Sequence, residues 1–325
     1  MTPAESAIAD FILSGLGDFD TLFAAAVAEN RAAGGPLAAV GDEPVPVQVF
    51  KETDLGPLPA LPSDRVFRTS GTTGQVRGVR RMRSTALYDR GAVAHARRVV
   101  PALPRQILSL CPSEPDSSLG HMLGLLGRVE QAFSDGSVHP DTWQRLRTMA
   151  SRGPVLLAAT AFALDALLAM EGAGPLNDDS VVMVTGGFKG RNVRLDAPSL
   201  YEALGERLGS ARVVGEYGMT ELSSQLWTQP VPCGAVPGAF LAPRWLRVRA
   251  ADPISGEPVQ SGAGVLRFWD LANAGGVLAI ETQDLGVVVP TPTGDRVHLV
   301  GRLQGAEARG CSLRAEATLR KVPGP

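Results

Sequence analysis

The sequence predicts an α/β protein in which a doubly wound, mostly parallel sheet is followed by a β-rich subdomain. Between residues 66 and 215, short apolar runs alternate with amphipathic stretches of helical length, which is typical of parallel strands joined by crossover helices. After about residue 225, strand-like runs follow one another between Gly, Pro and Asp turns, which favours an antiparallel arrangement. The 325 residues are enough to bury such a core.

Residues 1–64 are expected to form N-terminal helices and a Pro-rich connector. Thr2, followed by Pro and three residues later by Glu, is typical of a helix start, and a second helix is expected from about Asp20 to Ala33. The prolines of residues 41–63 predict an extended connector around one short strand at Val45–Phe50.

The α/β core is expected to span residues 65–228 and the β-rich subdomain residues 229–325. In the core we expect strands at Val66–Thr69, Gln106–Cys111, Pro154–Ala159, Val181–Thr185 and Arg212–Gly215. The helices between them are expected at Ser84–Val100, Gly120–Phe133, Pro140–Arg152, Ala161–Met170 and Pro198–Leu208. The subdomain strands are expected at Trp245–Ala250, Gly264–Trp269, Val277–Thr282, Leu285–Val289 and Val297–Val300, followed by a C-terminal tail that carries a cysteine.

The composition argues against several classes of protein. Lys and Arg number 31 against 33 Asp and Glu, so the net charge of −2 offers no basic surface for nucleic acid. The three cysteines are odd in number and widely spaced, which argues against a disulfide framework and a structural zinc site. The N-terminus lacks the basic region of a signal peptide, and the longest apolar stretch, Val155–Met170, is too short and too charged for a membrane span. We therefore expect a cytoplasmic protein.

A small polar loop follows the first expected core strand, in the sequence R-T-S-G-T-T-G-Q-V-R-G. Its two glycines frame two threonines, so that backbone N–H groups can converge on an anion while hydroxyls donate to it. The loop is not a Walker A motif, because no G-K-[ST] follows. A plain surface turn is the alternative. The candidate anion-binding residues are Ser70, Gly71, Thr72, Thr73 and Gly74.

A second segment, Gly215–Leu222, follows the last core strand and combines three kinds of side chain. The ring of Tyr217 can stack on a purine, the hydroxyl of Thr220 can reach an α-phosphate, and the carboxylate of Glu221 can hold Mg²⁺.

In this order, the two segments resemble the adenylate-forming superfamily, whose phosphate loop reads T-S-G-T-T-G-x-P-K-G and whose later block reads Y-G-x-T-E. Two further segments support the resemblance: Glu281–Gly286 is similar to the family's T-G-D-L-G, and Leu299–Gly305 to its G-R-x-x-D. The resemblance implies that ATP binds with Mg²⁺ on Glu221, and that Asp284 and Arg302 hold the ribose hydroxyls. Taken singly, the last two segments are more typical of a hairpin turn and a surface arginine.

The chain also departs from the superfamily pattern. Val76 and Arg77 replace the usual Pro and Lys, so Arg77 would be the cation that helps the loop to hold the β- and γ-phosphates. Gln283 replaces Gly, and Gly305 stands where Asp is usual. The chain ends soon afterwards, which predicts an N-domain-like fold without the usual C-terminal domain. Lys321 lacks the context of the family's catalytic lysine, so that role is not assigned to it.

A truncated member of this kind is similar to the LuxE-like acyl-protein synthetases. The matching segments are Asp116–Met122, Thr185–Gly190, the Y-G-M-T-E form of the block, and Arg309–Leu313. The resemblance implies that a fatty acid is activated as acyl-AMP, passes to Cys311 as a thioester and then goes to a partner acyl reductase.

Cys311 is bracketed by Arg309 and Arg314, and nearby cations raise the thiolate fraction of a thiol. The alternative is a quiet buried cysteine, as we assume for Cys111 and Cys233.

Two other places are candidates for contact with substrate. The resemblance places His121 near the bound carboxylate, where a neutral imidazole could orient the acid, although a structural histidine is the more common case. Gly186 and Gly187 follow an apolar strand at the edge where ligands bind, and could let adenine or the acyl chain approach the backbone. Lys189 could meet a phosphate or carboxylate, or be merely solvated.

The resulting hypothesis is a ligase that takes ATP, Mg²⁺ and a carboxylic acid, fatty or aryl, and forms an enzyme thioester. One alternative is an acyl-CoA ligase of the phenylacetate-CoA ligase type, which needs no enzyme cysteine. The other is a nucleotide-binding partner subunit that has lost catalysis. Pyrophosphate exchange separates the subunit from both enzymes, and CoA dependence separates the two enzymes.

Overall fold

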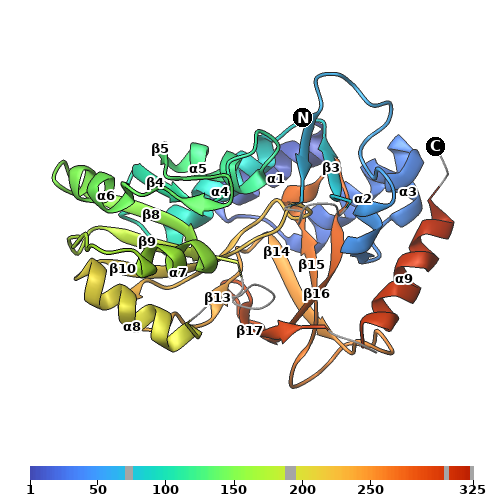
Figure 1. The fold of residues 1–325 in the computed structure, drawn as a ribbon. Coiled ribbons are helices and arrows are strands. Elements are labelled where there is room, and N and C mark those ends of the chain that lie inside the picture. Colours follow the sequence, from blue (N-terminus) through green and yellow to red (C-terminus); the bar gives the residue numbers. More distant parts are fainter. Residues whose placement is uncertain (70–75, 187–194, 304–306, 323–325) are drawn as a thin grey trace. The chain divides into compact units, whose positions relative to one another are not determined.

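The computed structural model describes residues 1–69, 76–186, 195–303 and 307–322, with the backbone alone for 307–313 (Figure 1). The chain forms two compact units. Unit 1 consists of residues 1–94, 219–224 and 241–325, and unit 2 of residues 95–218 and 225–240.

Unit 2 is built on a parallel sheet. Its parallel strands are β4 (Gln106–Leu110), β5 (Arg128–Gln131), β8 (Val155–Thr160), β9 (Val181–Thr185) and β10 (Arg212–Tyr217). They lie in the order β10-β9-β8-β4-β5, and each neighbouring pair is parallel. Two short strands, β11 (Leu226–Thr228) and β12 (Val231–Pro232), pair antiparallel with β10. A small hairpin joins β6 (Phe133–Ser134) to β7 (Ser137–Val138). The mostly parallel sheet is confirmed.

The sheet of unit 2 is wound in both directions. The chain runs outward from β4 to β5 and then returns past β4 to β8, so right-handed crossovers put the first helix on one face and the next three on the other. The helices are α5 (Ser118–Leu126), α6 (Thr142–Ala150), α7 (Ala161–Ala169) and α8 (Ala197–Leu208). The winding reverses between β4 and β8, and ligands of open α/β sheets bind beyond the carboxyl ends of strands at such a point.

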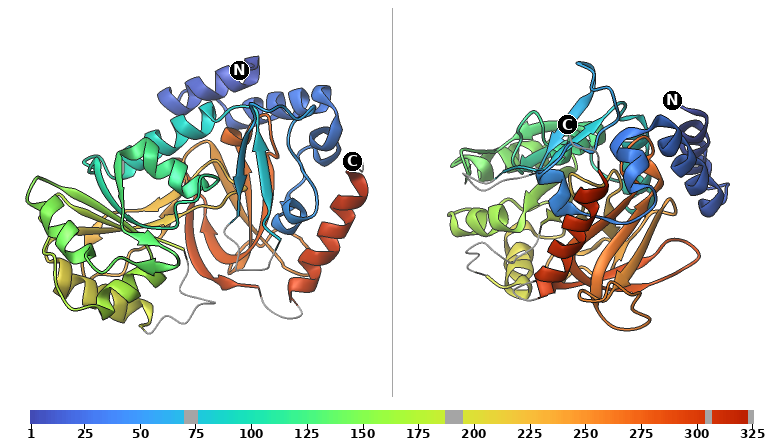
Figure 2. Two further views of the ribbon diagram at one scale, coloured as in Figure 1. Left: turned by 45° about the horizontal axis from the view of Figure 1, so that its top comes forward. Right: turned by 90° about the vertical axis from the view of Figure 1, so that its right-hand side faces the viewer.

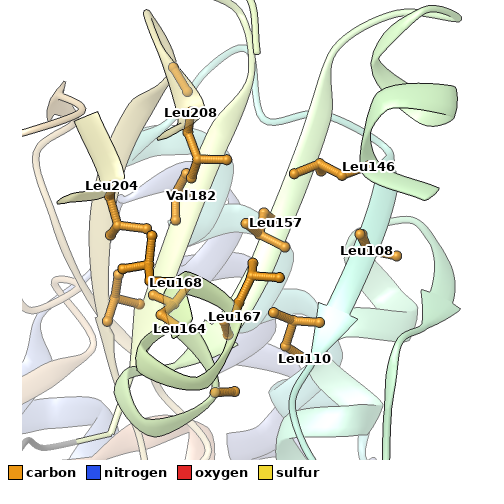
Figure 3. Packing of buried hydrophobic residues seen from close by; sticks show 14 of the residues in the cluster. Leu108, Leu110, Leu146, Leu157, Leu164, Leu167, Leu168, Val182, Leu204 and Leu208 are labelled. Carbon is orange, nitrogen blue, oxygen red and sulfur yellow. The ribbon is translucent and has the colours of Figure 1, made fainter. Parts of the chain in front are cut away.

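Leucine-rich packing holds α6, α7 and α8 to one face of this sheet (Figure 3). Leu108 and Leu157 project from strands into the cluster, where they meet Leu146 of α6 and Leu167 of α7. Burying each such side chain stabilises the fold by roughly 1.5–3 kcal/mol. Alternate strand residues such as Leu156 are fully buried too, so both faces of the sheet are covered.

Unit 1 contains an antiparallel sheet of β14 (Leu246–Ala251), β15 (Gly264–Asp270), β16 (Ala279–Val289) and β17 (Arg296–Arg302). The two-residue β1 (Val45–Pro46) joins β16 in parallel. The helices at the start of the chain are α1 (Pro3–Ser14), α2 (Phe19–Ala33), α3 (Gly35–Val40) and α4 (Ala86–Val99), and the short strand β13 is Phe240–Leu241. Residues of α1 and α2 pack against Trp245, Leu271 and Leu278.

Several predicted elements were wrong in detail. The strand at Val66–Thr69 is β2 (Arg65–Arg68), which pairs antiparallel with β3 (Val79–Met82) in a separate hairpin. The helix expected to reach Phe133 ends at Leu126, because the backbone of the next residue, Gly127, is extended. The residues that follow form β5 instead.

The structure also differs from the predicted elements in the connector, in the strands at 277–289 and at the C-terminus. The strand expected at Val45–Phe50 stops after two residues and continues as the 3₁₀ helix η1 (Val47–Lys51). The two strands expected at 277–289 are one strand, β16, with a register shift at Leu285/Gly286. The tail is the helix α9 (Glu307–Lys321), a stretch without proline that is rich in Ala, Arg, Leu and Glu.

Helix α9 lies against β1, η1 and α3 of unit 1, shown in red beside blue segments in Figure 2. Within the described part of the chain, no helix has the length and apolar character needed to cross a membrane.

Candidate functional site

Thr220 and Glu221 lie in unit 1, in a buried loop after β10. Arg80 of β3 donates to the Thr220 carbonyl at 3.1 Å, and the amide of Asn273 donates to the Glu221 carbonyl at 3.1 Å. Asn273 belongs to the short 3₁₀ helix η2 (Leu271–Asn273). The backbone of the two motif residues is therefore fixed by side chains from distant parts of the sequence.

The carboxylate of Glu221 is buried among cations. Burial raises its pKa, while the charges of Arg80, Lys51 and Arg302 act in the opposite direction. Among the described residues, no group of three His, Cys, Asp or Glu side chains could hold a metal ion. A single carboxylate fits Mg²⁺ nevertheless, because magnesium commonly takes one or two carboxylates and completes its shell with phosphate oxygens and water.

Asp284 and Arg302 are brought together by strand pairing in unit 1. They are register partners on β16 and β17, with the Arg302 Nε 3.7 Å from the Asp284 Oδ1. The charge of Arg302 is also one of those that oppose the burial-driven rise in the pKa of Glu221. Three residues from separate sequence motifs thus converge in this unit.

Tyr217 ends β10 in unit 2, and its ring meets Phe240 edge-on with 6.0 Å between the ring centroids. The residue before it, Glu216, was not identified as a candidate from the sequence. Its Oε2 accepts a hydrogen bond from the Thr185 hydroxyl at 2.5 Å, and burial raises its pKa to about 7. The signal in the sequence that could have identified Glu216 is an acidic residue within an otherwise apolar strand.

Two cysteines have thiols that are poor nucleophiles. Burial, and then the charge of Glu216, raise the pKa of Cys111 to about 12. Burial raises the pKa of Cys233 to about 11. Both are therefore protonated near neutral pH.

Arg77 contacts the two residues that precede the polar loop in the sequence. Its Nε donates to the Thr69 carbonyl at 2.6 Å and its Nη2 to the Arg68 carbonyl at 3.2 Å. The Gly78 N–H donates to the Thr69 hydroxyl at 2.8 Å.

His121 and Gly186 lie after the carboxyl ends of β4 and β9. His121 is half-buried in the first turn of α5, which is capped by the Ser117 hydroxyl. Gly186 is exposed at φ +74°, a conformation that favours glycine.

Several predicted site residues lie outside the described residues: Ser70, Gly71, Thr72, Thr73, Gly74, Gly187 and Lys189. Cys311 is on α9, where the structure describes the backbone alone. Lys321, at the end of α9, pairs with Glu43 with 2.5 Å between its Nζ and the carboxylate Oε2.

No protein-family model matches the sequence, and no curated protein matches it. Solved structures do match. ATP-bound MatB from Rhodopseudomonas palustris is 18% identical, with a TM-score of 0.50 over 73% of this chain and 47% of that chain. The amide bond synthetase McbA from Marinactinospora thermotolerans is 19% identical, with a TM-score of 0.52 over 74% and 49%. The anthranilate CoA ligase AuaEII in complex with anthranoyl-AMP is 14% identical, with a TM-score of 0.52 over 74% and 48%.

These matches confirm the predicted fold class. The described sheet and helices share the fold of these matched structures, and the chain spans about half of their length.

Proposed function

We propose that this protein is a ligase that uses ATP to activate a carboxylic acid as acyl-AMP. The observation that carries the proposal is the convergence of Glu221, Asp284 and Arg302 in unit 1. The presence of ATP and of an acyl-AMP in matched structures supports the same reaction class.

In this reaction the ionised carboxylate attacks the α-phosphorus of ATP, forming acyl-AMP and releasing pyrophosphate. No general base is needed, because the acid is already deprotonated at neutral pH. The main tasks of the protein are to position the two reactants and to neutralise charge on the phosphates.

The motif residues divide these tasks. Thr220 hydrogen-bonds the α-phosphate, Asp284 and Arg302 hold the ribose hydroxyls, and Tyr217 stacks on the adenine. The loop of Ser70–Gly74 and Arg77 holds the β- and γ-phosphates, while His121 orients the acid and Gly186 and Gly187 line its approach. Glu221 holds Mg²⁺, which when bound neutralises phosphate charge.

The second step transfers the acyl group to Cys311. Its thiolate attacks the acyl carbonyl, a thioester forms, and AMP leaves. Support comes from the other two cysteines, because the raised pKa values of Cys111 and Cys233 make their thiols poor acceptors. The thioester then passes to a partner protein such as an acyl reductase, as in the LuxE-like enzymes that the sequence resembles, and a fatty acid is the substrate class we favour.

A CoA thioester is the second candidate product, since one matched structure is a CoA ligase. Both candidates share the adenylation step and differ in the acceptor thiol.

The test is acylation without CoA. The purified protein is incubated with Mg-ATP and a panel of fatty and aryl acids, and its intact mass is recorded before and after neutral hydroxylamine. We expect a hydroxylamine-labile adduct that maps to the Cys311 peptide, disappears in Cys311→Ala and persists in the matched control Cys233→Ala.

Other outcomes separate the two steps. Release of AMP and pyrophosphate without an adduct contradicts the cysteine step and directs attention to CoA, which is then added to the same reactions. Absence of acid-dependent pyrophosphate exchange across the whole panel contradicts the adenylation step.

A further inference from the structure

Arg80 is a buried arginine that the nucleotide-binding motifs do not include. It lies on β3, and its guanidinium group has three acceptors: the Thr220 carbonyl at 3.1 Å, the Ser223 hydroxyl at 2.6 Å and the Asn273 Oδ1 at 2.8 Å. All of these groups belong to unit 1. One side chain thus connects the Y-G-M-T-E loop to strand β3 and to η2.

Asn273 extends this support to Glu221. Its Nδ2 donates to the Glu221 carbonyl at 3.1 Å and to the Val277 carbonyl at 2.8 Å, while its Oδ1 also accepts from the Ser223 N–H at 2.8 Å. The successive carbonyls of Thr220 and Glu221 are therefore both held through one network with Arg80 at its centre.

Asp270 closes the network on the far side of the loop. Its Oδ2 accepts from the backbone N–H groups of Ser223 at 3.1 Å and Ser224 at 2.9 Å, and its Oδ1 from the Ser224 hydroxyl at 2.7 Å. That hydroxyl in turn accepts from the Trp245 indole at 3.0 Å. The bonds from Arg80 and Asn273 thus hold the Thr220 and Glu221 residues by their backbone carbonyls, not by the Thr220 hydroxyl or the Glu221 carboxylate.

We propose that Arg80 is a positioning residue, which fixes the Thr220–Glu221 backbone so that the hydroxyl and the carboxylate meet the nucleotide and its magnesium ion. This inference rests on the proposed adenylation function. A loss of placement of about 1 Å in such a site can cost on the order of a hundredfold in rate.

An arginine suits this task better than a lysine. The planar guanidinium presents several donors in a fixed fork, so it can serve three acceptors in different directions at once. Burying it is costly: desolvation lowers the pKa of Arg80 to about 10, although the interactions with Asp270, Tyr88 and Glu221 act in the opposite direction.

The neighbouring residue provides a matched control. Arg81 is on the same strand and its side chain is also buried, but it pairs with Asp54 and Asp64, each at 2.8 Å. Both of these carboxylates lie outside the 219–224 loop. Arg81→Met removes a buried arginine with its ion pairs and leaves the Thr220–Glu221 support intact.

The experiment compares wild type, Arg80→Met, Arg80→Lys and Arg81→Met in full-length protein. Acid-dependent pyrophosphate exchange gives KM for Mg-ATP and KM for the acid, calorimetry with a non-hydrolysable ATP analogue and Mg²⁺ gives Kd, and thermal unfolding gives Tm. We expect Arg80→Met to weaken Mg-nucleotide binding by about 10- to 100-fold, which corresponds to lost hydrogen bonds from a charged donor. KM for the acid should change less than threefold, and Arg80→Lys should recover part of the loss.

Arg81→Met should lower Tm with less than a threefold change in nucleotide Kd. Equal effects of Arg80→Met and Arg81→Met on Kd, or equal rises in both KM values, would overturn the proposal, because either result indicates general destabilisation. If wild type binds Mg-nucleotide but exchanges no pyrophosphate with any acid, the adenylation function fails while the Kd comparison still decides the role of Arg80. If wild type does not bind the nucleotide, both the adenylation function and the positioning role of Arg80 are contradicted.

Discussion

Asp284 and Arg302 face each other across two antiparallel strands, with the guanidinium Nε 3.7 Å from the carboxylate Oδ1. Both residues are on paired strands rather than on a loop, next to the register shift at Leu285/Gly286, so strand pairing places them opposite each other before any ligand arrives. The pair is partly exposed, so it adds little to stability, and its value is in the geometry that it offers to a ligand.

Replacing Asp284 by Ala should remove discrimination at the ribose. If Asp284 accepts from ribose hydroxyls, wild type should prefer ATP to 2′-deoxy-ATP by about 10-fold or more in kcat/KM, and the variant should lose most of that preference. Pyrophosphate exchange with the two nucleotides measures it. His298→Gln, on the exposed side of β17, is the control. An unchanged preference in Asp284→Ala would rule out the ribose contact.

Glu216→Gln should change how stability depends on pH. The carboxyl has a pKa of about 7 in the folded protein against 4.5 as its ordinary value, so the folded state holds a proton that the unfolded chain has released between these pH values. The free energy of unfolding of wild type therefore falls as pH rises from about 4.5 to 7 and carries a cost of about 3 kcal/mol above that range.

Glutamine keeps an acceptor for Thr185 and has no proton to lose, so the variant should be the more stable protein at pH 8. Urea unfolding at a series of pH values measures this, with the exposed Glu202→Gln of α8 as control. Parallel pH profiles for wild type and Glu216→Gln would contradict the assignment.

Helix α9 should depend on a buried ion pair. Glu281 is 1% exposed and accepts from Arg314 of α9 at 2.8 Å and from Arg267 of β15 at 2.8 Å. Arg314→Met leaves Glu281 with Arg267 and should cost about 1–3 kcal/mol, whereas Glu281→Met leaves two cations together and should cost about 3–5 kcal/mol. Denaturant unfolding tests this order. Lys321→Met, which removes an exposed pair, should cost less than about 1 kcal/mol, and a reversed order would show that the pair is not the anchor.

Native-state alkylation should spare two of the three cysteines. With pKa values of about 12 and 11, the thiols of Cys111 and Cys233 are under about 0.1% ionised at pH 7.5. Peptide mapping after brief iodoacetamide treatment should find both unmodified, and both labelled after unfolding in urea. Rapid labelling of Cys111 in the folded protein would mean that its strand opens to solvent.

The sequence predicted the features that depend on a local pattern of residues or on the order of short motifs. The continuous apolar runs at 155–159 and 181–185 indicated buried parallel strands. The order of the motifs indicated Asp284 and Arg302, which are paired in the structure, and their role at the ribose stays a prediction. Strand β5 was missed, because Arg-Val-Glu-Gln has the polarity of an exposed helix and its strand character comes from pairing with β4. Arg80 was missed for a similar reason: adjacent arginines indicate a surface, and the acceptors that make burial tolerable are far along the chain.

The residues of the Arg80 network are far apart in the sequence, which determines when the network can form during synthesis. Arg80 precedes Thr220 by 140 positions and Asn273 by 193, so a growing chain cannot complete the support of the Y-G-M-T-E loop until η2 has left the ribosome. Nascent chains that already contain every residue of that loop would therefore still lack the ordered backbone for a nucleotide. Competence to bind it would arise late, once the chain has emerged as far as Asn273 of its 325 residues.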